Sequence, residues 1–176
     1  MRSTAKLGHD AACAAAVFLA LGIPLAADAA QDGARTADYR NPRYGFHLTF
    51  PADVFIEDAA QTTDSGRMFV SGDGRARLLA GALENTDGFS VAAYRDFVLH
   101  NSYPGSKLDY APLRRSWFVL SGVRDAYMFY ERVTFTCAGR IINSWAMVYP
   151  VAERRRYDPI VEQVARSYKA GEDACR

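Results

Sequence analysis

The chain is short of the residues on which most catalytic and metal sites depend. Its 176 residues include only three cysteines and three histidines. Two of the histidines, His47 and His100, lie beyond residue 30. No G-x-S-x-G elbow accompanies a serine, and no glycine-rich phosphate loop is complete. These shortages argue against nucleophilic hydrolysis, against a tetrahedral metal centre and against nucleotide binding.

The chain also lacks an excess of charge of either sign. Lys and Arg number 21 and Asp and Glu number 20, so the formal net charge is +1. A nucleic-acid partner is not expected, because neutralising phosphates needs a clear basic excess. With 49% hydrophobic and 23% charged residues, the composition is that of an ordinary globular protein. No segment after residue 30 is apolar enough to span a bilayer, so we do not expect an integral membrane protein.

Residues 1–30 have the pattern of a secretory signal peptide. Arg2 and Lys6 give a positive start, the stretch 11–27 is apolar, and small residues follow it. Pro24 interrupts the run of about 20 apolar residues that an uncleaved anchor needs. We therefore predict that residues 1–30 are removed on export and that the protein is periplasmic or secreted.

The two cysteines that would remain after cleavage are Cys137 and Cys175. In an oxidising compartment, such a pair indicates one disulfide. Shared metal ligation is the alternative, but it needs two more ligands at suitable spacing. We predict a disulfide that ties the C-terminal tail to the turn at Cys137.

Alternation of apolar and polar side chains predicts an antiparallel sheet of about six strands within one domain, 43–176. Residues 31–42 are polar and without period, and we expect a flexible N-terminal segment there. The expected strands are 43–50, 67–70, 75–83, 117–120, 126–136 and 141–149, with an edge strand at 107–113 because Pro112 interrupts it.

Two helices are expected in addition to the strands. The first follows Ser90 as N-cap, with Phe89 and Tyr94 placed for a hydrophobic staple. The second opens with Asp158 as N-cap and Pro159 at the first helical position. Strands joined by short turns, together with two helices, predict an α+β fold in which helices flank the sheet.

The segment 41–51, NPRYGFHLTFP, resembles the "YGFxxxYP" start of PsbP/Mog-type domains. The segments 129–133 and 157–161 are similar to those of small exported proteobacterial proteins with that fold. The resemblance extends over about residues 40–170. It implies a PsbP/Mog-like α/β/α sandwich and a binding or assembly role, and it supplies no catalytic residues. A photosynthetic role is not implied, because fold does not determine function.

Glu131 is the carboxylate of most interest. It shares a predicted strand face with Phe129 and Val133, and a buried carboxylate needs a partner. We expect a structural ion pair with an arginine. The alternative is a catalytic role in a cell-envelope hydrolase that uses paired carboxylates.

Basic and aromatic residues near the C-terminus are the candidate binding residues. They are Arg154, Arg155, Arg156 and Tyr157, together with Arg140. Arg114, Arg115 and Arg124 could extend the same basic face. A solvated loop is the alternative for the arginine run. Tyr103, Tyr110, Tyr149 and Tyr157 are expected either to be exposed or to cap the edges of the core.

The sequence thus favours an exported accessory or binding module without catalytic activity, cofactor or bound metal. Its expected partner is an envelope protein or an anionic envelope component. Besides the hydrolase, the alternative is a protein that binds calcium or a small ligand, because Asp64, Asp73 and Asp87 lie in predicted turns. Turn geometry alone also explains these aspartates.

Overall fold

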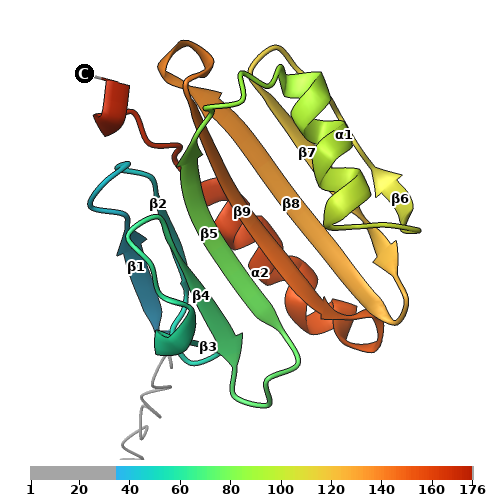
Figure 1. The fold of residues 1–176 in the computed structure, drawn as a ribbon. Coiled ribbons are helices and arrows are strands. Elements are labelled where there is room, and N and C mark those ends of the chain that lie inside the picture. The colour runs from blue at the N-terminus through green and yellow to red at the C-terminus, as the bar shows by residue number, and fades with distance from the viewer. Residues whose placement is uncertain (1–34, 176) are drawn as a thin grey trace, which may run out of the picture. The chain divides into compact units, whose positions relative to one another are not determined.

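A computed structural model of the chain describes residues 35–175 (Figure 1). The strands are β1 (Thr36–Arg40), β2 (His47–Pro51), β3 (Phe55–Glu57), β4 (Gly66–Ser71), β5 (Arg77–Glu84), β6 (Lys107–Tyr110), β7 (Trp117–Arg124), β8 (Tyr127–Thr136) and β9 (Ile141–Pro150). The α-helices are α1 (Val91–Asn101) and α2 (Arg154–Ser167). The predicted signal peptide lies outside the described residues.

The main sheet has seven strands in the order β3-β4-β5-β9-β8-β7-β6, and every neighbouring pair is antiparallel. A second sheet pairs β1 with β2. Helix α1 packs on one face of the main sheet, over β7 and β8, and helix α2 lies behind the opposite face (Figure 1). The predicted α+β sandwich is therefore confirmed. The strand expected at 43–50 is an exception, because it begins at His47 and belongs to the second sheet, while β3 takes an edge of the main sheet.

The two faces of the main sheet carry separate hydrophobic cores. The smaller core lies under α1 and includes Phe129 and Val133, so we name this the α1 face. The larger core lies under α2 and the β1–β2 sheet and includes Trp145 and Met147, so we name this the α2 face. Strand β9 alternates between them, with Ile142 on the α1 face, and is buried along most of its length.

The start of helix α1 follows local sequence signals. Ser90 accepts a hydrogen bond from the backbone N–H of Ala93, 3.1 Å away, and so caps the helix. The rings of Phe89 and Tyr94 are 5.6 Å apart, which is the staple contact. Both predictions for this helix are confirmed.

The expectation of a flexible segment at 31–42 is wrong for its described part. Residues 36–40 form β1 and pair with β2 along their whole length. Ala37 and Tyr39 pack against the larger core, and Asn41 is fully buried. Only every second side chain of β1 points inward, so a polar composition is compatible with a strand here. The pairing with β2 orders the segment.

Helix α2 begins at Arg154, not at Asp158. Residues 151–153 form a 3₁₀ turn that leads directly into the helix. Asp158 does not cap it, because its carboxylate accepts a hydrogen bond from the Tyr149 hydroxyl, 2.7 Å away. Pro159 therefore lies inside the helix instead of at its first position.

The C-terminal tail is held against the sheet by a disulfide and by hydrogen bonds. Cys137 and Cys175 are joined, as predicted. The Thr136 hydroxyl donates to the Gly171 carbonyl at 2.8 Å, and the Gly171 N–H donates to Asn143 at 3.2 Å. The disulfide therefore fastens a tail that already packs on the core.

Candidate functional site

The side chain of Glu131 lies beneath helix α1. In the sheet it is flanked by Leu120 of β7 and Ala146 of β9, which are both buried. The hydroxyl of Tyr103, just after α1, donates to its Oε2 at 2.8 Å. None of the salt bridges within residues 35–175 involves Glu131. The predicted arginine partner is therefore wrong, and a tyrosine holds the carboxylate instead.

The low-polarity surroundings of Glu131 change its acidity. Burial raises the pKa of Glu131 to about 7, although the hydrogen bond from Tyr103 acts in the opposite direction. Burial raises the pKa of Tyr103 far above its usual range, and the nearby Glu131 charge adds to the effect. Burial, with a smaller contribution from Glu131, also raises the pKa of Tyr94. Glycoside hydrolysis needs two carboxyl groups around one substrate, whereas the group bonded to Glu131 is a phenol.

The predicted arginine run forms the first turn of α2. Arg154 lies 3.4 Å from the carboxylate of Asp158, and Arg156 lies 3.6 Å from that of Glu153. Arg155 is exposed and takes part in none of the salt bridges within residues 35–175. Arg154 is thus compensated within the helix, whereas Arg156 shares Glu153, just before the helix, with Arg75 at 2.8 Å.

Tyr157 is not available to a partner. It is fully buried, and its ring lies 5.3 Å from that of Tyr149 and 6.3 Å from that of Phe55. Of the two possibilities that the sequence left open, exposure does not hold for Tyr157 and Tyr149, because both belong to the larger core. Tyr110 is 56% exposed, in agreement with expectation. Tyr103 is half-buried, stacked on Phe129.

Arg140 lies at the opposite end of β9 from the arginine run. Its guanidinium donates to the carbonyls of Cys137 and Cys175, at 3.1 and 3.0 Å. Strand β9 and the 3₁₀ turn Val151–Glu153 separate it from the start of α2, and the ten residues of the strand alone span about 33 Å. The fold does not bring Arg140 together with Arg154–Arg156.

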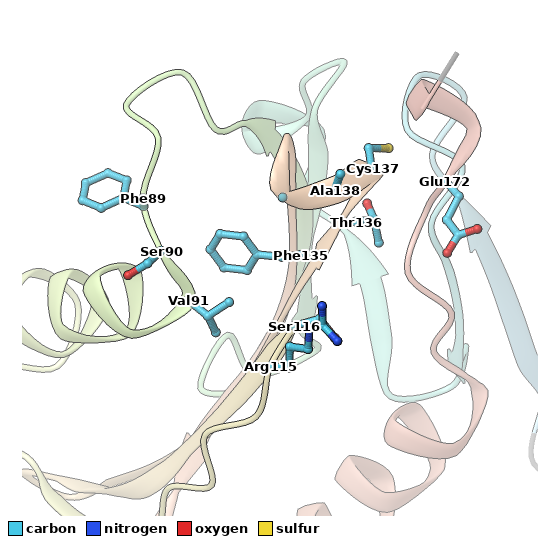
Figure 2. Close-up of a pocket in the computed structure, with 11 residues that line it drawn as sticks. Phe89, Ser90, Val91, Arg115, Ser116, Phe135, Thr136, Cys137, Ala138 and Glu172 are labelled. Atoms are coloured by element: carbon cyan, nitrogen blue, oxygen red, sulfur yellow. The ribbon is translucent and has the colours of Figure 1, made fainter.

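A cavity of about 790 Å³ lies at the N-terminal end of α1 (Figure 2). Phe135 points toward Ser90 and Val91, and Thr136 points to the other side of the strand (Figure 2). Arg115 and Glu172 supply its only charged side chains. The Ser90 hydroxyl is already committed to capping the helix. The lining therefore offers neither paired carboxylates nor a nucleophile beside a base.

Asp73 and its neighbours form a turn. The Ser71 hydroxyl donates to the Asp73 carboxylate at 2.6 Å, and the Arg75 N–H donates at 3.1 Å. These bonds and nearby arginine charges hold the pKa of Asp73 below its usual value.

No group of three or more His, Cys, Asp or Glu residues within 35–175 is placed to hold a metal ion. No helix of the described chain is long and apolar enough to cross a membrane.

Sequence reasoning missed a feature that only the topology creates. Helix α1 covers β7 and β8, whereas β3, β4 and β5 on the same face carry no α-helix (Figure 1). The register places apolar side chains there, with the exposed Arg77 in the row of Val70 and with Gly81 between Leu79 and Leu83. We name this the open apolar face; its residues are Ile56, Met68, Val70, Leu79 and Leu83.

The side chains of the open apolar face are unusually exposed for their type. Ile56 is 60% exposed, Leu83 44% and Leu79 37%. On α1, Phe97 is 47% exposed. Single exposed apolar residues are ordinary, but several on one sheet face are typical of an interaction surface. No local sequence pattern could have indicated this set, because its members come from three strands.

Comparison with known proteins identifies the fold. No protein-family model matches the sequence, and no curated protein matches it. The chain is similar to the solution structure of cyanobacterial PsbP (CyanoP) from Synechocystis, with a TM-score of 0.55, 14% identity, and coverage of 84% of this chain and 99% of that one. It is also similar to the Ran-binding protein Mog1p of Saccharomyces cerevisiae, with a TM-score of 0.54, 9% identity, and coverage of 80% and 98%. The chain has a PsbP/Mog-type fold.

Proposed function

We propose that the chain is an exported accessory module that acts by binding another protein and not by catalysis. The observation that carries this proposal is the open apolar face beside α1. Leu79 and Leu83 are large side chains left exposed on a sheet that carries a hydrophobic core on each face. Burying such a surface against a partner is favourable by about 25 cal/mol per Å² of apolar area.

The fold and the covalent structure support the proposal. One protein of similar fold, Mog1p, is a Ran-binding protein, so this fold can serve protein binding. The disulfide between Cys137 and Cys175 is typical of an oxidising compartment. Together with the signal-peptide pattern of residues 1–30, it favours a periplasmic or secreted location.

A crosslinking pull-down from the native envelope extract tests this function. The bait is the mature chain in four forms: wild type, Leu79→Asp, Leu83→Asp and Leu113→Asp. Leu113, 41% exposed, is the matched control, because it lies in the connection between β6 and β7 and away from the open apolar face. Thermal melting of each form verifies that it folds.

We expect one stoichiometric partner with the wild type and with Leu113→Asp, and its loss with Leu83→Asp and Leu79→Asp. An aspartate placed in an apolar contact must be desolvated without a partner, which costs several kcal/mol. The proposal is wrong if no partner is captured, or if the same partner is captured equally by all four forms.

A further inference from the structure

A second surface lies on the opposite face of the sheet, at its β6–β8 end. The larger core with α2 and the β1–β2 sheet covers this α2 face mainly over β4, β5 and β9. Toward the β6 edge, the register aligns Tyr110, Ser121 and Tyr130 in one row across three strands. Val119 and Arg132 form part of the next row. Aromatic and basic side chains from neighbouring strands therefore share one partly exposed surface.

The guanidinium of Arg132 is held in place by an aromatic ring. It lies over the indole of Trp117, 4.9 Å from the ring centre, and the guanidinium of Arg114 lies 5.8 Å from the same ring. Stacking of this kind orients a guanidinium while leaving its N–H edge available. Neither Arg114 nor Arg132 takes part in a salt bridge with any residue of the range 35–175. The surface therefore carries uncompensated positive charge.

Buried polar atoms without hydrogen-bond partners gather beside Arg132. They are Arg132 Nε and Trp145 Nε1. Trp145 lies opposite Arg132 in the sheet and is fully buried. Its ring is 6.2 Å from that of Tyr168, whose hydroxyl is hydrogen-bonded to Thr134. Both nitrogens can donate a hydrogen bond, and leaving a buried donor unsatisfied costs about 1–3 kcal/mol.

We propose that this surface binds carboxylate side chains of an acidic peptide segment in a partner protein. We name it the Arg132 surface; its residues are Tyr110, Arg114, Trp117, Tyr130 and Arg132. An arginine fork matches a carboxylate with two parallel hydrogen bonds. Tyr, Trp and Arg are also the residues enriched at the energetic centres of protein interfaces. The charge of the surface therefore selects an acidic occupant, and its rings supply apolar contact area.

The shape of the Arg132 surface favours a peptide over a membrane. Arg132 is half-buried and lies against Trp117, so a single side chain can reach its N–H edge, whereas a flat layer of headgroups cannot. The aromatic residues come from three neighbouring strands, so an occupant that crosses the strands can contact more than one ring. The Arg132 surface is separate from the open apolar face, so a negative result for peptide binding would leave the proposed function untouched.

Fluorescence anisotropy with a fluorescein-labelled hexaglutamate peptide tests the proposal, with hexaglutamine as the neutral control. The variants are Arg132→Gln, Arg132→Lys and Arg114→Gln, and Arg155→Gln is the matched control. Arg155 is also an arginine without a salt bridge within the described residues, but it lies in α2. Arg114 is exposed, so its replacement is compatible with folding even if that of Arg132 is not.

We expect hexaglutamate to bind and hexaglutamine not to bind. Arg132→Gln weakens hexaglutamate binding about tenfold, the typical effect of losing one charge-assisted pair. Arg132→Lys also weakens it, because lysine keeps the charge but lacks the planar fork. Arg114→Gln weakens it less, and Arg155→Gln leaves it within about twofold.

Three results would each overturn the proposal. Equal losses with Arg132→Gln and Arg155→Gln would mean that only overall charge matters. Binding to phosphatidylglycerol vesicles or to inorganic phosphate that depends on Arg132, without peptide binding, would assign the surface to a phosphate ligand. Absence of any hexaglutamate binding to the folded wild type would mean that solvent satisfies the buried donors.

Discussion

The half-buried carboxylate of Glu131 makes the stability of the fold depend on pH. Burial raises the pKa of Glu131 from an ordinary 4.5 to about 7. A group with a raised folded-state pKa stabilises the protein fully below its unfolded pKa, and this stability is lost as the pH rises through the folded pKa. The window therefore runs from about pH 4.5 to about pH 7. At 1.36 kcal/mol per pKa unit, the difference between the folded-state and unfolded-state pKa of Glu131 corresponds to about 3 kcal/mol in the free energy of unfolding.

Replacing Glu131 by glutamine isolates this effect. A glutamine stays neutral at every pH, and its side-chain oxygen can still accept the hydrogen bond from Tyr103. Urea unfolding of both proteins, followed by tryptophan fluorescence between pH 4 and pH 8, gives their free energies of unfolding. We expect the variant to gain about 3 kcal/mol relative to the wild type from the lower to the higher pH. Other titrating groups are the same in both proteins and cancel in the difference.

Two further variants make this test specific. Tyr103→Phe removes the hydrogen bond that lowers the pKa of Glu131, so the loss of stability extends to higher pH. Glu162→Gln is the matched control, because the Glu162 side chain is 71% exposed and no pH-dependent difference is expected. Parallel pH profiles for the wild type and Glu131→Gln would refute the reasoning, since the carboxylate would then ionise as freely as in water.

Other predictions concern the C-terminal tail. Reduction of the Cys137–Cys175 disulfide, which closes a separation of 38 residues, should lower the free energy of unfolding by about 4 kcal/mol in the chain-entropy model. Urea melts with and without reductant measure this, and a Cys137→Ser/Cys175→Ser double variant that still responds to reductant would contradict it. Gly171→Ala should destabilise by roughly 3 kcal/mol, because the added methyl group would meet the backbone carbonyl of Tyr44. Gly72→Ala, which meets nothing within 4 Å, should stay within about 0.5 kcal/mol in the same assay.

The sequence predicts most of the fold where the pattern is local. Alternation along Ile141–Pro150 indicates β9, and the Ser90 cap locates the start of α1. The short strand β3, Phe55–Glu57, has too few residues to show a period. Helix α2 begins one turn before Asp158, whose carboxylate accepts a hydrogen bond from the Tyr149 hydroxyl, a contact that the local pattern does not reveal.

The candidate sites were less predictable, because they depend on contacts between distant segments. Strand alternation correctly placed Glu131 on the face of Phe129, but its partner Tyr103 is 28 residues away and follows a helix. The stacking of Arg132 on Trp117 joins two strands across a turn and leaves no local signature. Tyr157, which beside the arginine run appeared exposed, turns inward because the first turn of α2 already faces the core.

Site-specific photo-crosslinking in the native envelope would test the binding role most directly. A photoreactive phenylalanine analogue is placed at Leu83 in the open apolar face or at Leu113, the equally exposed control. We expect one discrete crosslinked protein from position 83, and we expect that protein to be absent from the products of position 113. The absence of any crosslink at position 83 in a folded, exported protein, or the same products from both positions, would contradict a partner-binding role for this face.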